Sequence, residues 1–326
     1  MTNAGVSEDT TLRVMSYNIQ GLPNRFFPVA RLNQRLEAIV RFIGDVVKRY
    51  DVEVLILEEA YDKRLYRMIA TELEGSLKYG TRVIGRTKNN SDWNTHIDTS
   101  RVLFHVMNGG ICIFSKFPIE EKHAMIFKDS AGTCSFVGKG AILAVINKNG
   151  KLISVVGTHF QADVMCSRTG IRHKQFLQIL QWLNDLFNGK IAGNKTYAVS
   201  RDLPIIMGGD FNSCSVNDAE HYNKMLNQCK DHNIEFKTTF LDNKPDPTYD
   251  TLNDFCRLQV NSDYKHIFDY IFVTPNVKVM EAQKSIRDKL NTPLTLKKRV
   301  LSCFCHEECE IYNASDHYPV FSVLSL

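Results

Sequence analysis

Apolar residues follow two alternating patterns along this chain. Short apolar runs, typical of buried strands, cover residues 12–19, 52–57, 82–85, 110–115, 141–146, 152–156, 204–208, 267–273 and 318–323. Helical spacing of apolar residues predicts helices over 32–47, 63–73, 172–187 and 222–229. The turn 147–150 predicts a hairpin, while 87–106 and 242–258 are expected to be irregular. This alternation predicts an α/β protein whose sheets are covered by helices.

The stretch 203–212 combines a buried strand with a polar end. Gly208 and Gly209 allow a tight turn, and Asp210 and Asn212 follow directly. If the chain stays extended there, the two polar side chains point to one side and Phe211 points into the core. On its own this pattern is equally typical of an ordinary Gly-Asp turn at a strand end.

Other predicted strands also carry polar residues at or beside their ends. These residues are Asn18, Glu59, His159, Asp269, Asp316 and His317, in addition to Asp210 and Asn212. Two packed mixed sheets, each covered by helices, would bring them to one edge if the last strand runs antiparallel to its neighbours. Because acids and histidines are costly to bury unpaired, a shared metal ion or anion is expected there.

These residue types suit the hydrolysis of a phosphate ester. Carboxylate and amide oxygens favour Mg²⁺, and Glu59 is the candidate to hold an ion that neutralises charge on the phosphate and leaving oxygens. His317, oriented by an acid, is the candidate general base that takes a proton from water. His159 is the candidate to stabilise the pentacoordinate phosphorus by a hydrogen bond.

Composition sets the broad class of the chain. With 326 residues, 44% of them hydrophobic, and no linker or repeat, we expect one domain over 12–326 after a polar tail at 1–11. The net charge of +4 is too small to predict nucleic-acid binding. No apolar run approaches membrane-spanning length and residues 1–11 lack a signal-peptide core, so we expect a soluble protein, and a monomer.

The nine cysteines allow several interpretations. Cys112 lies in an apolar run and is expected to be an inert core thiol. Cys303, Cys305 and Cys309 gather around His306, where a zinc site, a disulfide-pinned hairpin and free thiols all remain open.

Six short motifs in order resemble those of the endonuclease/exonuclease/phosphatase superfamily. They are Ser16-Tyr17-Asn18, Leu57-Glu58-Glu59, Gly157-Thr158-His159, Gly208-Gly209-Asp210-Phe211-Asn212, Phe268-Asp269-Tyr270 and Ser315-Asp316-His317. Their flanks are similar to those of neutral sphingomyelinases, in particular the secreted bacterial sphingomyelinase C type. The motifs span nearly the whole chain, which makes the resemblance specific.

The resemblance implies a DNase I-like fold, a four-layer α/β/β/α sandwich of two mixed sheets. It also implies a phospholipase C-type phosphodiesterase that hydrolyses sphingomyelin to ceramide and phosphocholine. One central Mg²⁺, replaceable by Mn²⁺ or Co²⁺, would be held by Glu59 with Asn18 and Asp316 nearby. Catalytic roles would fall to His317, His159, Asp210, Asn212, Asp269 and Asp316. For Asp269 a purely structural role, capping loop amides, is an equal alternative, and Glu58 is expected to face away from the site.

Features outside the centre also follow from the resemblance. Cys134 and Cys166 stand where the bacterial enzymes have a disulfide, and Val300, Leu301 and Phe304 lie where those enzymes carry a membrane-inserting hairpin, here within 294–312. An edge hairpin with no membrane role is the alternative. Met107, Asn108 and Lys63 replace the acids and the asparagine of an auxiliary metal site, so that site is not expected. A secreted or peripheral membrane location is expected, with a cytoplasmic one as the alternative.

Three rival functions remain at this stage. A nuclease of the same superfamily would need a basic track, and Arg82, Arg86, Lys88 and Arg101 are too scattered to form one. A phosphoinositide phosphatase is disfavoured because its tryptophan-containing variants of the motifs are missing from the sequence. A non-catalytic membrane-binding module would have to lack a catalytic group, and every one is present. The lipid headgroup is not determined by the sequence.

Overall fold

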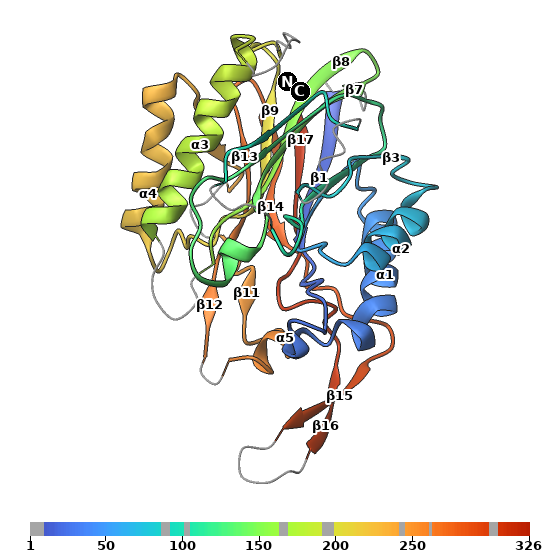
Figure 1. The fold of residues 1–326 in the computed structure, drawn as a ribbon. Coiled ribbons are helices and arrows are strands. Elements are labelled where there is room, and N and C mark those ends of the chain that lie inside the picture. The colour runs from blue at the N-terminus through green and yellow to red at the C-terminus, as the bar shows by residue number, and fades with distance from the viewer. Residues whose placement is uncertain are drawn as a thin grey trace, which may run out of the picture.

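The fold is known from a computed structural model, which describes residues 10–85, 92–100, 105–162, 169–190, 199–240, 245–260, 263–299 and 306–326. Two large mixed β-sheets lie face to face between helices (Figure 1). The strand order is β14-β17-β1-β2-β5-β3 in the first sheet and β10-β13-β9-β8-β7-β6-β4 in the second. The expected four-layer α/β/β/α sandwich is therefore confirmed.

The first sheet consists of β1 (Thr11–Asn18), β2 (Val54–Glu58), β3 (Tyr79–Gly80), β5 (Cys112–Ser115), β14 (Lys278–Ser285) and β17 (Val320–Ser325). The second consists of β4 (Thr95–Asp98), β6 (Ile119–Ile126), β7 (Gly140–Lys148), β8 (Lys151–His159), β9 (Ile205–Asp210), β10 (Lys237–Thr238) and β13 (Asp269–Val273). Two small pairs stand apart from the sheets, namely β11 (Tyr249–Asp250) with β12 (Lys265–His266), and β15 (Leu294–Arg299) with β16 (His306–Ile311).

The helices cover the outer faces of the two sheets, α1 and α2 on one side and α3 and α4 on the other (Figure 1). Their bounds are α1 Leu32–Arg49, α2 Lys63–Leu73, α3 Thr169–Phe187, α4 Ala219–Asn227 and the short α5 Asp254–Arg257. The 3₁₀ turns are η2 (Pro28–Ala30), η4 (Gly132–Phe136) and η5 (Gln228–His232). Asp62 caps the start of α2, because its carboxylate accepts hydrogen bonds from the backbone N–H groups of Arg64 and Leu65.

Three apolar clusters hold the four layers together. One lies between the sheets and is rich in β-branched residues such as Val54, Ile142 and Val155. The other two lie under the helices, with Ile39 of α1 in one and Phe176 of α3 in the other. In the part of the chain that is described, no helix has both the length and the apolarity to cross a bilayer.

Strand direction explains why the polar strand ends meet. β1 runs parallel to β2 and β8 runs parallel to β9, so Asn18 lies beside Glu58 and His159 lies beside Asp210. β13 runs antiparallel to β9, which places Asp269, its first residue, opposite Asp210. The last strand, β17, runs antiparallel to β1, which was the condition for the polar strand ends to meet. The stretch before β17 therefore reaches the same edge of the sandwich.

Three local predictions differ from the structure. The strand expected at 82–85 is instead β3 at Tyr79–Gly80, because residues 81–85 follow β5 through isolated hydrogen bonds and Gly85 turns at φ 90°. The stretch 87–106 contains β4 among its described residues, and 242–258 contains β11 and α5. Strands β6 and β14 were not predicted, because charged residues interrupt their apolar pattern. The predicted hairpin at 147–150 is confirmed, since β7 and β8 pair antiparallel on either side of it.

Gly209 is the position at which β9 most strictly excludes a side chain. Its φ is 151°, and a Cβ atom there would lie 1.9 Å from the carbonyl oxygen of Thr158 in the parallel strand β8. We expect Gly209→Ala to lower the free energy of unfolding by about 1–3 kcal/mol, because β8 and β9 would have to separate. Urea unfolding tests this, with Gly75→Ala as the control, since a Cβ at Gly75 meets no atom within 4 Å. Equal stability of the two variants would contradict the expectation.

The pair β15–β16 forms an antiparallel hairpin that extends beyond the body of the molecule (Figure 1). Its base packs on α5 through Phe255, Leu296 and Ile311. Val300, Leu301 and Phe304, the residues expected to contact a membrane, lie outside the described residues, as do Cys303 and Cys305. The membrane role of the hairpin therefore stays a prediction.

Candidate active site

Glu59 and Asn18 form one side of the site, at the ends of the parallel strands β2 and β1. Asn18 Nδ2 donates to Asp210 Oδ2 at 3.0 Å and to Glu59 Oε1 at 3.3 Å, so it bridges the two sheets. Glu59 adopts φ 60°, a left-handed conformation in which the chain leaves β2. Gly110 allows this turn, because a Cβ there would lie 3.0 Å from Glu59 Cα.

Glu58 and Glu59 occupy different environments, as predicted from their adjacent positions. Glu58 is fully buried and accepts a hydrogen bond from Ser16 Oγ at 2.7 Å. Burial, followed by the charge of Asp269, raises the pKa of Glu58 well above its ordinary value. Glu59 has a side chain 16% exposed, so it is the glutamate that a ligand can reach.

Asp210 lies at the centre of the site, where it contacts residues from both sheets. Its Oδ1 accepts a hydrogen bond from the backbone N–H of Asn212 at 2.8 Å. The chain turns at Asn212, with φ 49°, instead of staying extended, and Phe211 is fully buried as expected. Asn212 Nδ2 donates to the carbonyl of Phe160 at 3.3 Å, which keeps the amide beside His159.

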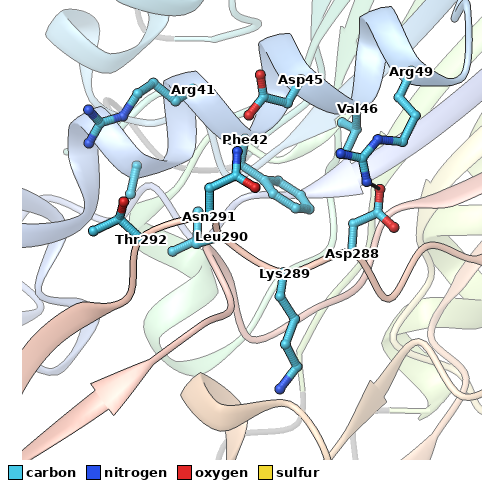
Figure 2. A pocket seen from close by; sticks show the side chains of 11 residues that line it. Arg41, Phe42, Asp45, Val46, Arg49, Asp288, Lys289, Leu290, Asn291 and Thr292 are labelled. Atoms are coloured by element: carbon cyan, nitrogen blue, oxygen red, sulfur yellow. Dashed lines mark hydrogen bonds and ion pairs between the residues drawn. The ribbon is translucent and has the colours of Figure 1, made fainter.

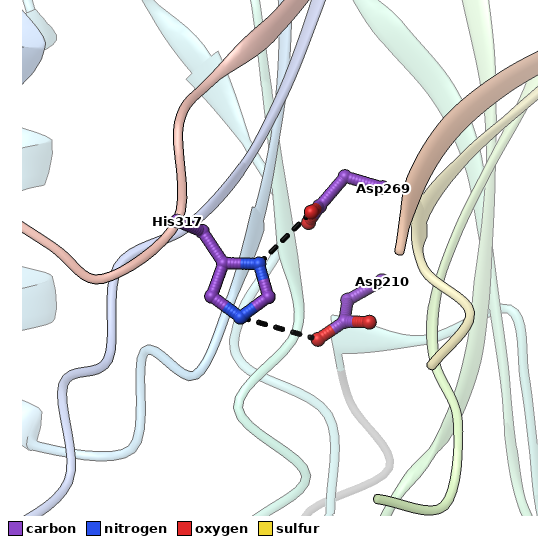
Figure 3. Close-up of side chains that lie close together, drawn as sticks. All are labelled: Asp210, Asp269 and His317. Carbon is purple, nitrogen blue, oxygen red and sulfur yellow. Dashed lines mark hydrogen bonds and ion pairs between the residues drawn. The ribbon is translucent and has the colours of Figure 1, made fainter. Parts of the chain in front are cut away.

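His317 faces Asp269 and Asp210 (Figure 3). Its Nδ1 lies 2.9 Å from Asp269 Oδ2, and its Nε2 lies 3.9 Å from Asp210 Oδ2. When Nδ1 donates to Asp269, Nε2 is left as the acceptor on the side of Asp210. The arrangement is that of a histidine oriented by one carboxylate and open to a water molecule on its other nitrogen.

The charges around His317 decide its protonation. Burial alone would lower the pKa of His317, but the carboxylates of Asp269, Asp210 and Asp316 raise it well above its ordinary value. Burial raises the pKa of Asp269 to about 6, although His317 acts in the opposite direction. A cation bound near these carboxylates would lower the pKa of His317 toward the range in which the ring accepts a proton.

His159 faces a buried lysine that the sequence analysis did not identify. Lys139 Nζ lies 2.8 Å from His159 Nε2 and donates to the carbonyl of Phe160 at 2.7 Å. Burial, then Lys139 and His317, lower the pKa of His159 well below its ordinary value, so the ring is neutral. His159 Nε2 also lies 3.4 Å from Asp210 Oδ2. With Lys139 donating to Nε2, the proton of a neutral ring lies on Nδ1, a buried atom with no hydrogen-bond partner among the described residues.

Asp316 is held by two glutamines from distant parts of the chain. Gln20 Nε2 donates to Asp316 Oδ2 at 2.6 Å, and Gln259 bonds both Gln20 and the same carboxylate. Beneath them the fully buried Arg35 donates to the carbonyls of Ile19, Gln20, Ala30 and Ala314. Arg35 thus ties the segment after β1 to the segment before His317. Gln20, Gln259 and Arg35 were also missed in the sequence, since no motif marks them.

The donor set fits a hard divalent cation. Glu59 Oε2 and Asp269 Oδ1 are buried and have no hydrogen-bond partner among the described residues. Burial, then the neighbouring Asp316, raise the pKa of Glu59 to about 7. Oxygen ligands with uncompensated negative charge favour Mg²⁺. Asp210, Asp269 and His317 also approach within 4.8 Å of one another, but an ion there would take the carboxylate that orients the histidine.

The residues that replace the auxiliary metal ligands have other contacts. Asn108 donates to the carbonyl of Tyr61 at 3.0 Å and accepts from Gly110 N at 3.0 Å, while Met107 packs against Tyr61 and Val137. Lys63 is exposed at the start of α2. Cys134 is a buried free thiol, which corrects the expected disulfide, and its expected partner Cys166 lies outside the described residues. Cys112 is a buried free thiol as expected.

Comparison with known proteins supports this description. The Endonuclease/Exonuclease/phosphatase family matches residues 15–317. Sphingomyelinase C 2 of Leptospira interrogans is 29% identical over 97% of this chain and 46% of its own length, so the chain spans about half of that relative. A sphingomyelinase C of Bacillus cereus is 28% identical over 99% of this chain and 92% of its own length.

Solved structures show the same fold. Beta toxin of Staphylococcus aureus, in a mutant with bound magnesium ions, superposes with a TM-score of 0.75 at 23% identity, covering 96% of this chain and 99% of that one. Sphingomyelinase C of Streptomyces griseocarneus has a TM-score of 0.73 at 20% identity and covers 96% of this chain and 99% of its own. The chain therefore belongs to the endonuclease/exonuclease/phosphatase family and is similar to the sphingomyelinase C proteins within it.

Proposed function

We propose that this protein is a Mg²⁺-dependent phosphodiesterase that hydrolyses sphingomyelin to ceramide and phosphocholine. The observation that carries the proposal is the meeting of Glu59, Asp210, His159 and the His317–Asp269 pair at one edge of the sandwich. The sphingomyelinase C names of its relatives support the substrate. Glu59, Asn18 and Asp316 are the residues that would hold the metal, which would supply positive charge to the phosphate and the leaving oxygen.

The side chains divide the reaction between them. His317 Nε2 takes a proton from a water molecule held between it and Asp210, while Asp269 keeps the ring oriented and stabilises its positive charge. The water oxygen bonds to phosphorus, and the ceramide oxygen leaves with the electron pair of the broken P–O bond and takes a proton from solvent. Lys139, which contacts His159 Nε2, supplies positive charge to the non-bridging oxygens in place of the hydrogen bond expected from His159, and Asn212 supplies a hydrogen bond to them.

A nuclease remains the alternative function. A nuclease would need a row of basic side chains to bind nucleic acid. Arg82 is paired with Asp92 at 2.6 Å, and Arg86, Lys88 and Arg101 lie outside the described residues. The test is to incubate the protein with sphingomyelin vesicles and with plasmid DNA, each with Mg²⁺ and with EDTA. Phosphocholine release that requires Mg²⁺, with intact plasmid, is the expected result. Cleaved plasmid without phosphocholine would contradict the proposal.

Metal binding should also be measurable without turnover. We expect Mg²⁺ to raise the melting temperature of the wild-type protein, because a cation bound only to the folded state stabilises it. Glu59→Gln should lose that shift and most activity, while Glu74→Gln, at the exposed end of α2, should keep both. An equal Mg²⁺-induced shift in Glu59→Gln would remove Glu59 from the metal site.

A further inference from the structure

Four aromatic rings extend from the active site along the small pair β11–β12, and we call them the aromatic shelf: Tyr249, Tyr264, His266 and Phe268. Tyr264, His266 and Phe268 alternate along an extended chain and so share one face. Their rings stack in sequence, with centroids 3.9 Å and 5.1 Å apart. Tyr249, in β11, lies opposite His266 of the paired strand β12. Each of the four is only partly buried.

The inner end of the aromatic shelf touches the candidate base. The ring centroid of Tyr249 lies 4.9 Å from that of His317, and the centroid of Phe268 lies 6.4 Å from it. Tyr249 and Phe268 are 5.8 Å apart. A phosphate bound beside His317 would therefore have two aromatic side chains within reach of one of its ester groups.

Contacts behind the shelf fix Tyr249 in place. Its neighbour Asp250 is buried, lies 3.0 Å from Arg287 and accepts a hydrogen bond from the hydroxyl of Tyr318 at 3.2 Å. Tyr318 directly follows His317 in the chain. The shelf and the base are thus held by one buried set of contacts, so the distance between them is set by the fold.

We propose that Tyr249 and Phe268 bind the quaternary ammonium of a choline headgroup, a subsite that rests on the proposed function. The ammonium of a phosphocholine ester is two carbons from the ester oxygen, which suits rings beside the phosphate position. A quaternary ammonium has no N–H group to donate, so aromatic faces, with their negative π-clouds, are its best partners.

Charge favours the inner end of the shelf over the outer end. An open hollow at the outer end is lined by Arg257, Lys265 and Asp263 together with Tyr264 and His266, so its two basic side chains outnumber its one acid and disfavour a cation. The cation is therefore held next to Tyr249 and Phe268.

The test compares sphingomyelin with its uncharged isostere, in which a 3,3-dimethylbutyl group replaces choline. The two substrates have the same shape and differ in the positive charge. We expect the wild-type protein to favour sphingomyelin in kcat/KM by about tenfold. Tyr249→Leu and Phe268→Leu should reduce that ratio toward one. If a substitution only disturbed the neighbouring His317, kcat/KM would fall equally for both substrates and their ratio would not change. The ratio therefore reports recognition of the headgroup.

The control is Tyr312→Leu, which removes a partly buried tyrosine that stacks with Lys289 near the base of the hairpin. It should keep the wild-type ratio. Equal hydrolysis of both substrates by the wild-type protein would overturn the subsite while leaving the proposed function intact. A wild-type ratio in both Tyr249→Leu and Phe268→Leu would also overturn the subsite and leave the proposed function intact. No hydrolysis of either substrate would overturn the proposed function and the subsite together.

Discussion

Replacing His317 by alanine is expected to lower kcat for sphingomyelin hydrolysis by about 10²–10⁴-fold, the range typical of general-base catalysis. His317 Nδ1 bonds Asp269 and its Nε2 faces Asp210, so no other described side chain offers an oriented acceptor at that position. KM should change little, because the ring is expected to act on water and not to bind the lipid. Steady-state kinetics on sphingomyelin vesicles measures both constants.

The matched control is His173→Ala on α3, a histidine whose ring contacts the backbone of His221 outside the site. It should keep wild-type activity. Circular dichroism of both variants should match the wild-type protein. Retained hydrolysis in His317→Ala, with the fold intact, would assign the base to another group.

The largest effect on stability is expected at Arg35. Its guanidinium is completely buried, stacks on the ring of Phe255 at 4.1 Å and donates to carbonyls of three separate segments. Methionine can fill much of the volume but cannot donate, so Arg35→Met would leave those carbonyls buried without partners. Since each unsatisfied group costs about 1–3 kcal/mol, we expect a loss of about 3–5 kcal/mol in the free energy of unfolding.

Arg41→Met on the same helix is the control for this prediction. Arg41 is exposed at the rim of a small hollow between α1 and residues 288–292 (Figure 2). Its replacement should change the free energy of unfolding by less than about 0.5 kcal/mol, as at ordinary surface sites. Urea unfolding of the three proteins measures the difference. Equal stability of Arg35→Met and Arg41→Met would show that the carbonyls find other partners.

The sequence was informative where each local signal agreed with the tertiary structure. The apolar runs that became β1, β2, β8 and β9 end in polar residues, and strand direction then brings those ends to one edge. Glu58 and Glu59 could be told apart because adjacent side chains point in different directions. The small strand β3 was misplaced because its two residues carry no alternating pattern of their own.

Residues that act through long-range contacts could not be predicted. Lys139 reaches His159 across paired strands, and Gln259 reaches Asp316 from the irregular region after α5. Neither has a neighbouring motif, and a buried lysine or a glutamine in a loop is recognisable only when the fold is known. The cysteines illustrate the opposite case, since resemblance predicted a bridge and Cys134 is a buried free thiol.

The most direct test of the account is hydrolysis of sphingomyelin in water enriched in ¹⁸O, with the products analysed by mass spectrometry. Attack of water on phosphorus, activated by His317, predicts one ¹⁸O atom in phosphocholine and none in ceramide, with both products dependent on Mg²⁺. Label in ceramide, or phosphocholine formed equally well in EDTA, would contradict it.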